Sequence, residues 1–110
     1  MEITYQDFEK VEVRVGRILE ASFFKEALKP AYKLVIDFGE LGIKKSSAQI
    51  TQNYKIEDLV GREIIAVVNF PPKQIANFVS EVLVLGVNDN DGNVVLLAPD
   101  RVVSLGKRMY

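Results

Sequence analysis

The sequence predicts an all-β fold, a small barrel, and three observations lead to that prediction. Short segments rich in Val, Ile and Leu recur along the 110 residues, turn signals of Gly, Pro and Asn separate them, and helical periodicity is weak. A hydrophobic fraction of 48% and a charged fraction of 26% are typical of a globular chain. We therefore expect one domain that spans residues 1–110.

The first two expected elements are a short helix and a strand. Thr4 and Asp7 have the spacing of a capping box, which predicts a short amphipathic helix over residues 5–10. Residues 11–15 then alternate valine with charged residues, as in a half-buried strand. Gly16 interrupts this alternation, which predicts a β-bulge or a barrel corner at that position.

The next two strands form the clearest hairpin of the sequence. Residues 32–38 place large apolar side chains at every second position, the pattern of a strand with one buried face. Gly39 and Gly42 bound a hairpin-sized turn, and both are free to adopt positive φ. The returning segment, residues 43–51, has β-branched ends and a polar middle.

The rest of the chain completes the barrel. One helical turn is expected at residues 56–59, ended by Gly61, before a continuous apolar strand at 64–70 that two prolines stop. A helical turn between the third and fourth strands stands where an OB-fold has its helix. We therefore predict a five-stranded OB-fold barrel with short helical segments and N- and C-terminal extensions. The last two strands are expected at residues 79–85 and 94–98, with a turn at residues 88–93 between them.

Composition excludes several classes of chemistry. The chain has no Cys and no His, which excludes zinc fingers, thiol nucleophiles, serine–histidine triads and disulfides. The acidic N-terminus has no apolar signal core and no stretch approaches the ~20 apolar residues of a membrane helix, so we expect a cytoplasmic protein without membrane insertion. A net charge of -1 does not favour nucleic-acid binding. Residues 23–56 nevertheless carry six basic and three acidic side chains, so a local basic face is compatible with the sequence.

Two motifs with apparent chemistry do not support a metal site or catalysis. The run NDNDGN lacks the glycine that a calcium loop starting at Asp89 requires, so we interpret it as a hairpin turn. Lys45 and Ser47 share one strand face, but no oxyanion hole or orienting group accompanies them. No glycine-rich phosphate loop is present. We expect no enzyme activity, no metal and no cofactor.

Two segments are candidate binding surfaces. An unpaired buried hydroxyl costs about 1–3 kcal/mol of stability, so the polar middle of the strand at 43–51 is not expected in the core. We interpret this strand as a binding surface. The alternative is an exposed edge strand protected by lysines. In Asn69–Lys73 (NFPPK) an amide, a ring and a cation adjoin in a loop that two prolines hold extended. The alternative there is that Phe70 fills the barrel mouth. Phe23 and Phe24 point to opposite faces, so at most one belongs to the core.

The segments VEVRVGRI, KPAYKLVIDFGELGIKKSSAQIT and VVNFPPKQIANFVSEVLVLG closely resemble the CsaA family of small secretion-linked chaperones, over residue 8 to about residue 99. That family is similar to the dimeric tRNA-binding domain appended to methionyl-tRNA synthetases. The wider tRNA-binding domains carry a Ser-Glu-Gly-Met stretch, of which Ser80 and Glu81 match here while Val82 and Leu83 do not. The resemblance implies an OB-fold homodimer that acts on unfolded or precursor proteins, with tRNA binding as an inherited property.

The resemblance also implies a binding surface at its matching polar positions. These are Arg14, Ser47, Gln49, Asn69, Ser80 and Glu81. We add three lysines and three apolar residues from the two candidate segments and the residues that follow them, and this part of the surface is our own assignment. The added residues are Lys44, Lys45, Lys73, Phe70, Ile75 and Phe78.

These inferences give one expected function and one alternative. The expected function is an ATP-independent export chaperone that holds apolar segments of unfolded or precursor polypeptides in a groove and so slows their aggregation. The alternative is a protein that recognises tRNA structure through phosphate contacts and base stacking. The expected partners are a second copy of the chain, through anchors at Phe8, Leu105 and Met109, and the secretion motor.

Overall fold

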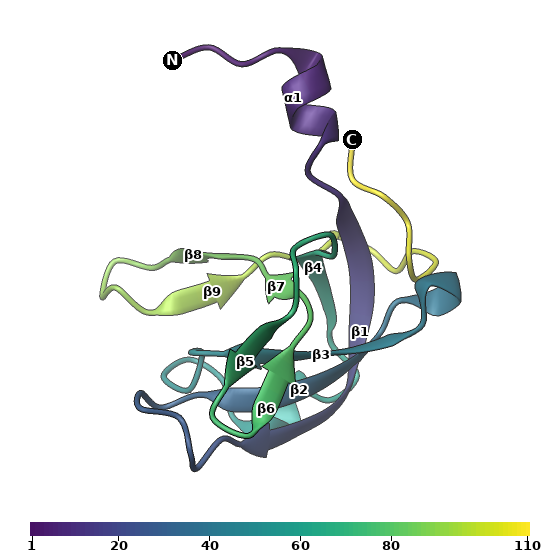
Figure 1. The fold of residues 1–110 in the computed structure, drawn as a ribbon. Coiled ribbons are helices and arrows are strands. Elements are labelled where there is room, and N and C mark those ends of the chain that lie inside the picture. Colours follow the sequence, from purple (N-terminus) through teal and green to yellow (C-terminus); the bar gives the residue numbers. More distant parts are fainter.

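The computed structural model describes residues 1–110 and contains the predicted five-stranded OB-fold barrel (Figure 1). All neighbouring strands of the barrel are antiparallel, in the order β3-β2-β1-β4-β7. These five strands are β1 (Val13–Phe23), β2 (Tyr32–Asp37), β3 (Ile43–Ala48), β4 (Glu63–Val67) and β7 (Leu83–Val84). Two further hairpins, β5–β6 (Lys73–Ile75 and Phe78–Ser80) and β8–β9 (Gly86–Asn88 and Val94–Leu96), attach to it.

Strand β1 is the middle strand of the sheet order, and it pairs with two neighbours in succession. Its first half pairs with β4 and its second half with β2. The bulge lies between Ile18 and Glu20, so of the two alternatives predicted at Gly16, a bulge or a barrel corner, the bulge is wrong by a few residues. A Cβ at Gly16 would lie 2.6 Å from Ile36 Cγ2 and 2.7 Å from the Phe38 ring. Glycine is therefore needed there for close packing, not for a break in the ladder.

The predicted β2–β3 hairpin is confirmed. Every second residue of 32–38 is buried, which satisfies the alternation in the sequence. A short 3₁₀ turn, η1 (Gly39–Leu41), joins the strands, with Gly39 at φ 66° and Gly42 at φ 91°. The returning strand ends at Ala48, earlier than the predicted Thr51.

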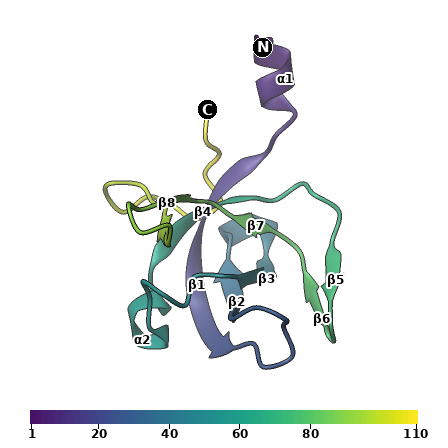
Figure 2. The same ribbon diagram turned by 90° about the vertical axis from the view of Figure 1, so that its left-hand side faces the viewer.

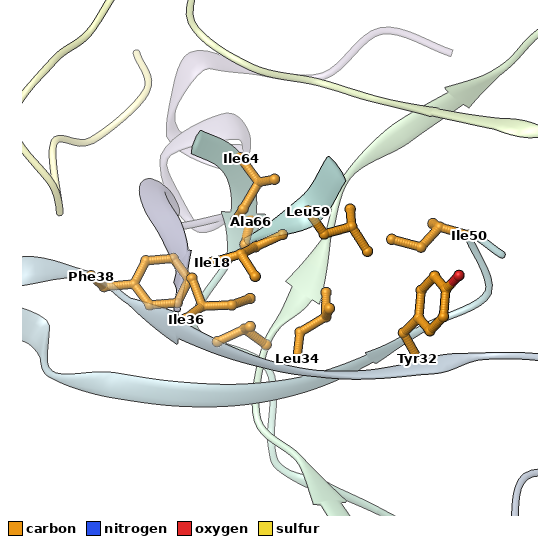
Figure 3. Packing of buried hydrophobic residues seen from close by; sticks show 10 residues of the cluster. Ile18, Tyr32, Leu34, Ile36, Phe38, Ile50, Leu59, Ile64 and Ala66 are labelled. Atoms are coloured by element: carbon orange, nitrogen blue, oxygen red, sulfur yellow. The ribbon is translucent and has the colours of Figure 1, made fainter. Parts of the chain in front are cut away.

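The core fills the interior of the barrel with side chains from β1, β2 and β4 and from the segments between the barrel strands (Figure 3). The predicted helical turn is present as α2 (Ile56–Leu59), and its fully buried Leu59 packs into the cluster. Gly61 ends it at φ 88°, as expected. The ten buried members of the cluster are Ile18, Tyr32, Leu34, Ile36, Phe38, Ile50, Leu59, Ile64, Ala66 and Val82.

The structure departs from the predicted strands in the second half of the chain. The apolar strand predicted to reach Phe70 ends at Val67. The single strand predicted at residues 79–85 is divided into β6 and β7, and β6 pairs with β5 in a hairpin. The turn of that hairpin contains Ala76 at φ 51°, a conformation that non-glycine residues rarely adopt. Sequence patterns do not signal such a turn.

The NDNDGN segment forms the turn of the β8–β9 hairpin, as interpreted from the sequence. The Asp89 carboxylate accepts hydrogen bonds from the Asn53 amide and from the backbone N–H groups of Asp91 and Asn93. The Asn53 amide, followed by the Asn93 N–H, holds the pKa of Asp89 below its ordinary value. The carboxylate therefore organises the turn.

Both chain ends lie on one side of the barrel (Figures 1 and 2). The predicted capping box of Thr4 and Asp7 is present at helix α1 (Tyr5–Glu9), which has no buried residue and stands away from the barrel. The C-terminal segment lies along β1, where the Met109 N–H donates to Val13 O and the Gly106 N–H to Val15 O, each at 2.8 Å. No helix is long and apolar enough to cross a membrane.

Candidate functional site

The candidate surface surrounds a contact that we call the seam. It joins residues 45–47 of β3 to residues 80–82, which are the last residue of β6 and the two that follow it. Here one backbone bond and several side-chain bonds close the barrel, in place of a continuous ladder. The Glu81 N–H donates to Lys45 O at 2.8 Å, and the Lys45 N–H donates to the Glu81 carboxylate at 3.0 Å. Glu81 thus replaces a strand residue at the edge of β3.

Serine hydroxyls complete the seam. The Ser47 N–H donates to Ser80 Oγ at 3.2 Å, and the fully buried Ser46 hydroxyl donates to Val82 O at 3.0 Å. The polar middle of β3 is therefore explained in part by barrel closure, because these hydroxyls satisfy backbone groups that would otherwise be unpaired. Ser80 and Glu81 are both predicted site residues, and their side-chain oxygens accept the backbone hydrogen bonds that close the barrel.

Two lysine ammonium groups lie over an aromatic ring beside the seam. Lys45 Nζ is 5.3 Å and Lys33 Nζ 5.8 Å from the centre of the Phe78 ring. Phe24, which is 1% exposed, packs edge-on against Phe78 with ring centres 5.4 Å apart. The expectation that at most one of the adjacent phenylalanines is core is confirmed, since Phe23 is 52% exposed.

Lys33 is a surface residue that sequence reasoning missed. It lies directly opposite Ser47 in the β2–β3 register, on the face that also carries Lys45. The signal was present in the sequence, since Lys33 and Asp37 are the charged residues at the outward positions of the alternation over residues 32–38. Lys44 falls on the other face with Ser46, so the structure separates the two adjacent lysines.

A hollow of about 280 Å³ lies at the Pro71 end of the β5–β6 hairpin, and we call it the apolar hollow. Phe70 and Leu83 stand at it with 54% and 49% of their surfaces exposed. Phe70 therefore does not fill the barrel mouth. The lining residues are Phe70, Pro71, Lys73, Ser80, Glu81, Val82 and Leu83.

A second hollow of about 370 Å³ lies between the β1–β2 loop and β5, and we call it the loop hollow. Lys73 lines both hollows, so they adjoin along β5. The predicted site residues Ser47, Gln49 and Ile75 line the loop hollow together with the fully exposed Leu28. Of the twelve predicted site residues, nine lie in the hollows or beside the seam, and Arg14, Lys44 and Asn69 do not.

Arg14 and Asn69 hold other parts of the chain. The Arg14 guanidinium donates to Glu12 Oε1 at 2.6 Å and to Gly106 O at 2.9 Å, which ties β1 to the C-terminal segment. The Asn69 amide accepts from the Glu12 N–H at 2.9 Å and donates to Lys10 O at 2.7 Å. Both side chains are therefore engaged within the molecule.

Comparison with known proteins gives one consistent family. Residues 13–108 match the family model described as "Putative tRNA binding domain". A methionine–tRNA ligase of Bdellovibrio bacteriovorus is 36% identical over 108 residues, which cover 98% of this chain but 16% of the ligase. The chaperone CsaA from Bacillus anthracis superposes with a TM-score of 0.94 at 51% identity, with both chains fully covered. The CsaA chaperone protein from Picrophilus torridus gives 0.93 at 61% identity, over 99% of this chain and 100% of that one.

Proposed function

The chain belongs to the tRNA-binding domain family, and from this premise we propose that it is a chaperone that binds unfolded or precursor polypeptides without ATP. The CsaA relatives are named chaperones and match the whole chain, whereas the ligase relative exceeds it several-fold in length. We extend the proposal to a cytoplasmic, non-enzymatic protein whose clients are destined for export and pass to the secretion motor.

The observation that carries the proposal is the apolar hollow. Phe70 and Leu83 expose about half of their surfaces beside the buried Val82, and such neighbouring apolar groups favour contact with apolar side chains. A buried aromatic anchor contributes about 2 kcal/mol or more at an interface. Reversible capture of unfolded segments by this hollow lowers the concentration of aggregating chains.

The proposed assembly is a homodimer through the chain ends. Helix α1 has five residues and none is buried, although helices this short are unstable without tertiary packing. Tyr5, Phe8, Val11 and Met109 line a shared hollow between α1 and the C-terminal segment. A second copy packed there would bury these apolar groups and support the helix.

A test compares two phenylalanines of equal exposure. Phe70→Ala removes the anchor of the apolar hollow, while Phe23→Ala removes a ring that is 52% exposed on β1. We expect Phe70→Ala to weaken binding of a permanently unfolded, carboxymethylated polypeptide about tenfold or more, and Phe23→Ala to change it little. Equal affinity of both variants and the native chain, with unchanged unfolding curves, contradicts the proposed site.

One observation favours tRNA binding as a second function. None of the four ion pairs in the structure involves Lys33 or Lys45, and both ammonium groups lie over the Phe78 ring. Unpaired cations beside an aromatic ring are suited to phosphate contacts. In a double Lys33→Ala, Lys45→Ala variant we expect tRNA affinity to fall and its salt dependence to drop by about one unit per lost phosphate contact. Retained tRNA binding with an unchanged salt dependence contradicts this function.

A further inference from the structure

Strand β5 has an unpaired edge at the surface of the molecule. It pairs with β6 alone, and in Figure 2 it is the outermost strand beside the barrel. Lys73 and Gln74 are exposed, and Ile75 is half-buried. The other side of the hairpin is engaged, because the chain continuing from β6 bonds to β3 at the seam.

The register of the hairpin shows which backbone groups the edge presents. Ile75 pairs with Phe78 across a two-residue turn, Gln74 with Val79, and Lys73 with Ser80. In an antiparallel pair, hydrogen-bonded and non-bonded residue pairs alternate, and the pair next to a two-residue turn is hydrogen-bonded. The N–H and C=O of Gln74 therefore point away from β6. An extended chain alongside β5 would find one donor and one acceptor there.

The two hollows lie on either side of Lys73, next to this edge. The apolar hollow is at the Pro71 end, and the loop hollow extends to Ile75. An extended chain rises about 3.3 Å per residue, so a few residues laid along β5 reach both hollows. An extended chain paired with the β5 edge would therefore pass both hollows along its length.

We propose that β5 binds an extended client segment as an added strand, with client side chains in the two hollows; this rests on the chaperone function proposed above. Main-chain pairing is independent of sequence, which suits a protein that accepts many clients. Pro71 and Pro72 have no N–H, and Ala76 turns the chain, so the edge is limited to three residues. The area buried along so short an edge is far below the ~1,200 Å² that a stable dimer buries. This favours a transiently bound polypeptide over a second copy of the chain.

The test uses two variants of Gln74. Gln74→Pro removes the outward N–H and places a ring on the edge, without deleting a bond to β6. Gln74→Ala removes the same side chain, including its amide bond to Ala76 O, and leaves the backbone edge intact. With the carboxymethylated unfolded polypeptide as probe, we expect affinity to fall about tenfold or more in Gln74→Pro and less than about twofold in Gln74→Ala.

The outcomes separate this inference from the function on which it rests. If the native chain does not bind the probe, the chaperone function itself fails. If it binds and Gln74→Pro binds equally well, only the added strand is wrong. A change in mass of Gln74→Pro by light scattering shows a contact between copies instead, and overturns the inference. Should that variant not fold, the native chain is tested with two apolar peptides, one N-methylated at the odd and one at the even residues. We expect one of the two peptides to bind more weakly, because its methyl groups block the backbone donors that face β5. Equal binding of the two peptides overturns the inference.

Discussion

Replacement of Glu81 tests whether its carboxylate closes the barrel. In Glu81→Ala the Lys45 N–H loses its acceptor, while the backbone bond from the Glu81 N–H to Lys45 O remains. A hydrogen bond to a charged group contributes about 1.5–3 kcal/mol, and partial exposure at the seam reduces this to about 1–2 kcal/mol. Unfolding entropy near 2.1 cal/mol/K per residue converts that loss to a fall in Tm of about 4–9 °C for a chain of this length.

Two control variants isolate the contribution of the Glu81 carboxylate to the seam. Glu81→Gln keeps an oxygen that accepts from the Lys45 N–H, so its Tm falls by less than about 4 °C. Lys45→Ala removes the ammonium group but keeps the backbone N–H, so it leaves the seam bond in place. The assay is thermal unfolding followed by circular dichroism, with hydrogen exchange of the Lys45 amide as a local readout. Unchanged melting of Glu81→Ala, or an equal fall in Glu81→Gln, refutes the role of the carboxylate.

Four further predictions concern packing, pH, assembly and metal. Gly16→Ala forces a Cβ to within 2.6 Å of Ile36 and destabilises the fold by about 1–3 kcal/mol in urea unfolding. The control Ser22→Ala, exposed on the same strand, changes the stability by less than about 0.5 kcal/mol. Equal urea midpoints of the two variants contradict the close packing at Gly16. Because the folded state lowers the pKa of Asp89, its stabilisation is complete above the unfolded value near 3.8 and is lost as the pH falls through the lower folded pKa. Asp89→Asn should therefore lose less stability than the native chain on acidification below pH 4, and parallel losses disprove this. Light scattering at micromolar concentration should give twice the 12.4 kDa chain mass, and a monomer contradicts the homodimer. A chelator should leave the Tm unchanged, and a drop of several degrees shows a bound metal.

The elements that the sequence predicted well are those governed by short-range patterns. The alternation at residues 32–38, the capping box of Thr4 and Asp7, and the helical turn before Gly61 each depend on residues a few positions apart. Strand ends and the bulge were less accurate, because they depend on contacts between residues far apart in the sequence; Gly16, where a bulge was expected, instead packs closely against Ile36 and Phe38.

The sequence predicted the region of the candidate site but not the role of each residue in it. Glu81 meets Lys45 36 positions away and Asn69 meets Glu12 57 positions away, and such contacts have no period in the sequence. Polar residues chosen as ligand contacts could not be told from residues that bond to the backbone, since both need the same donors and acceptors. The β5–β6 hairpin was missed because its turn has Ala76, not glycine, at positive φ.

The arrangement of the chain ends has a practical consequence for attaching the protein to other objects. The turn of the β5–β6 hairpin points away from both chain ends (Figures 1 and 2), whereas the Pro71 end of the hairpin follows Asn69, which bonds to Lys10 O and to the Glu12 N–H of the N-terminal segment. A linker at either end therefore leaves the loop hollow facing away from a sensor surface or a fused fluorescent reporter, while the apolar hollow lies nearer the attached end. Immobilisation through one end and then the other gives two orientations whose agreement shows that binding at the hollows is independent of the tether.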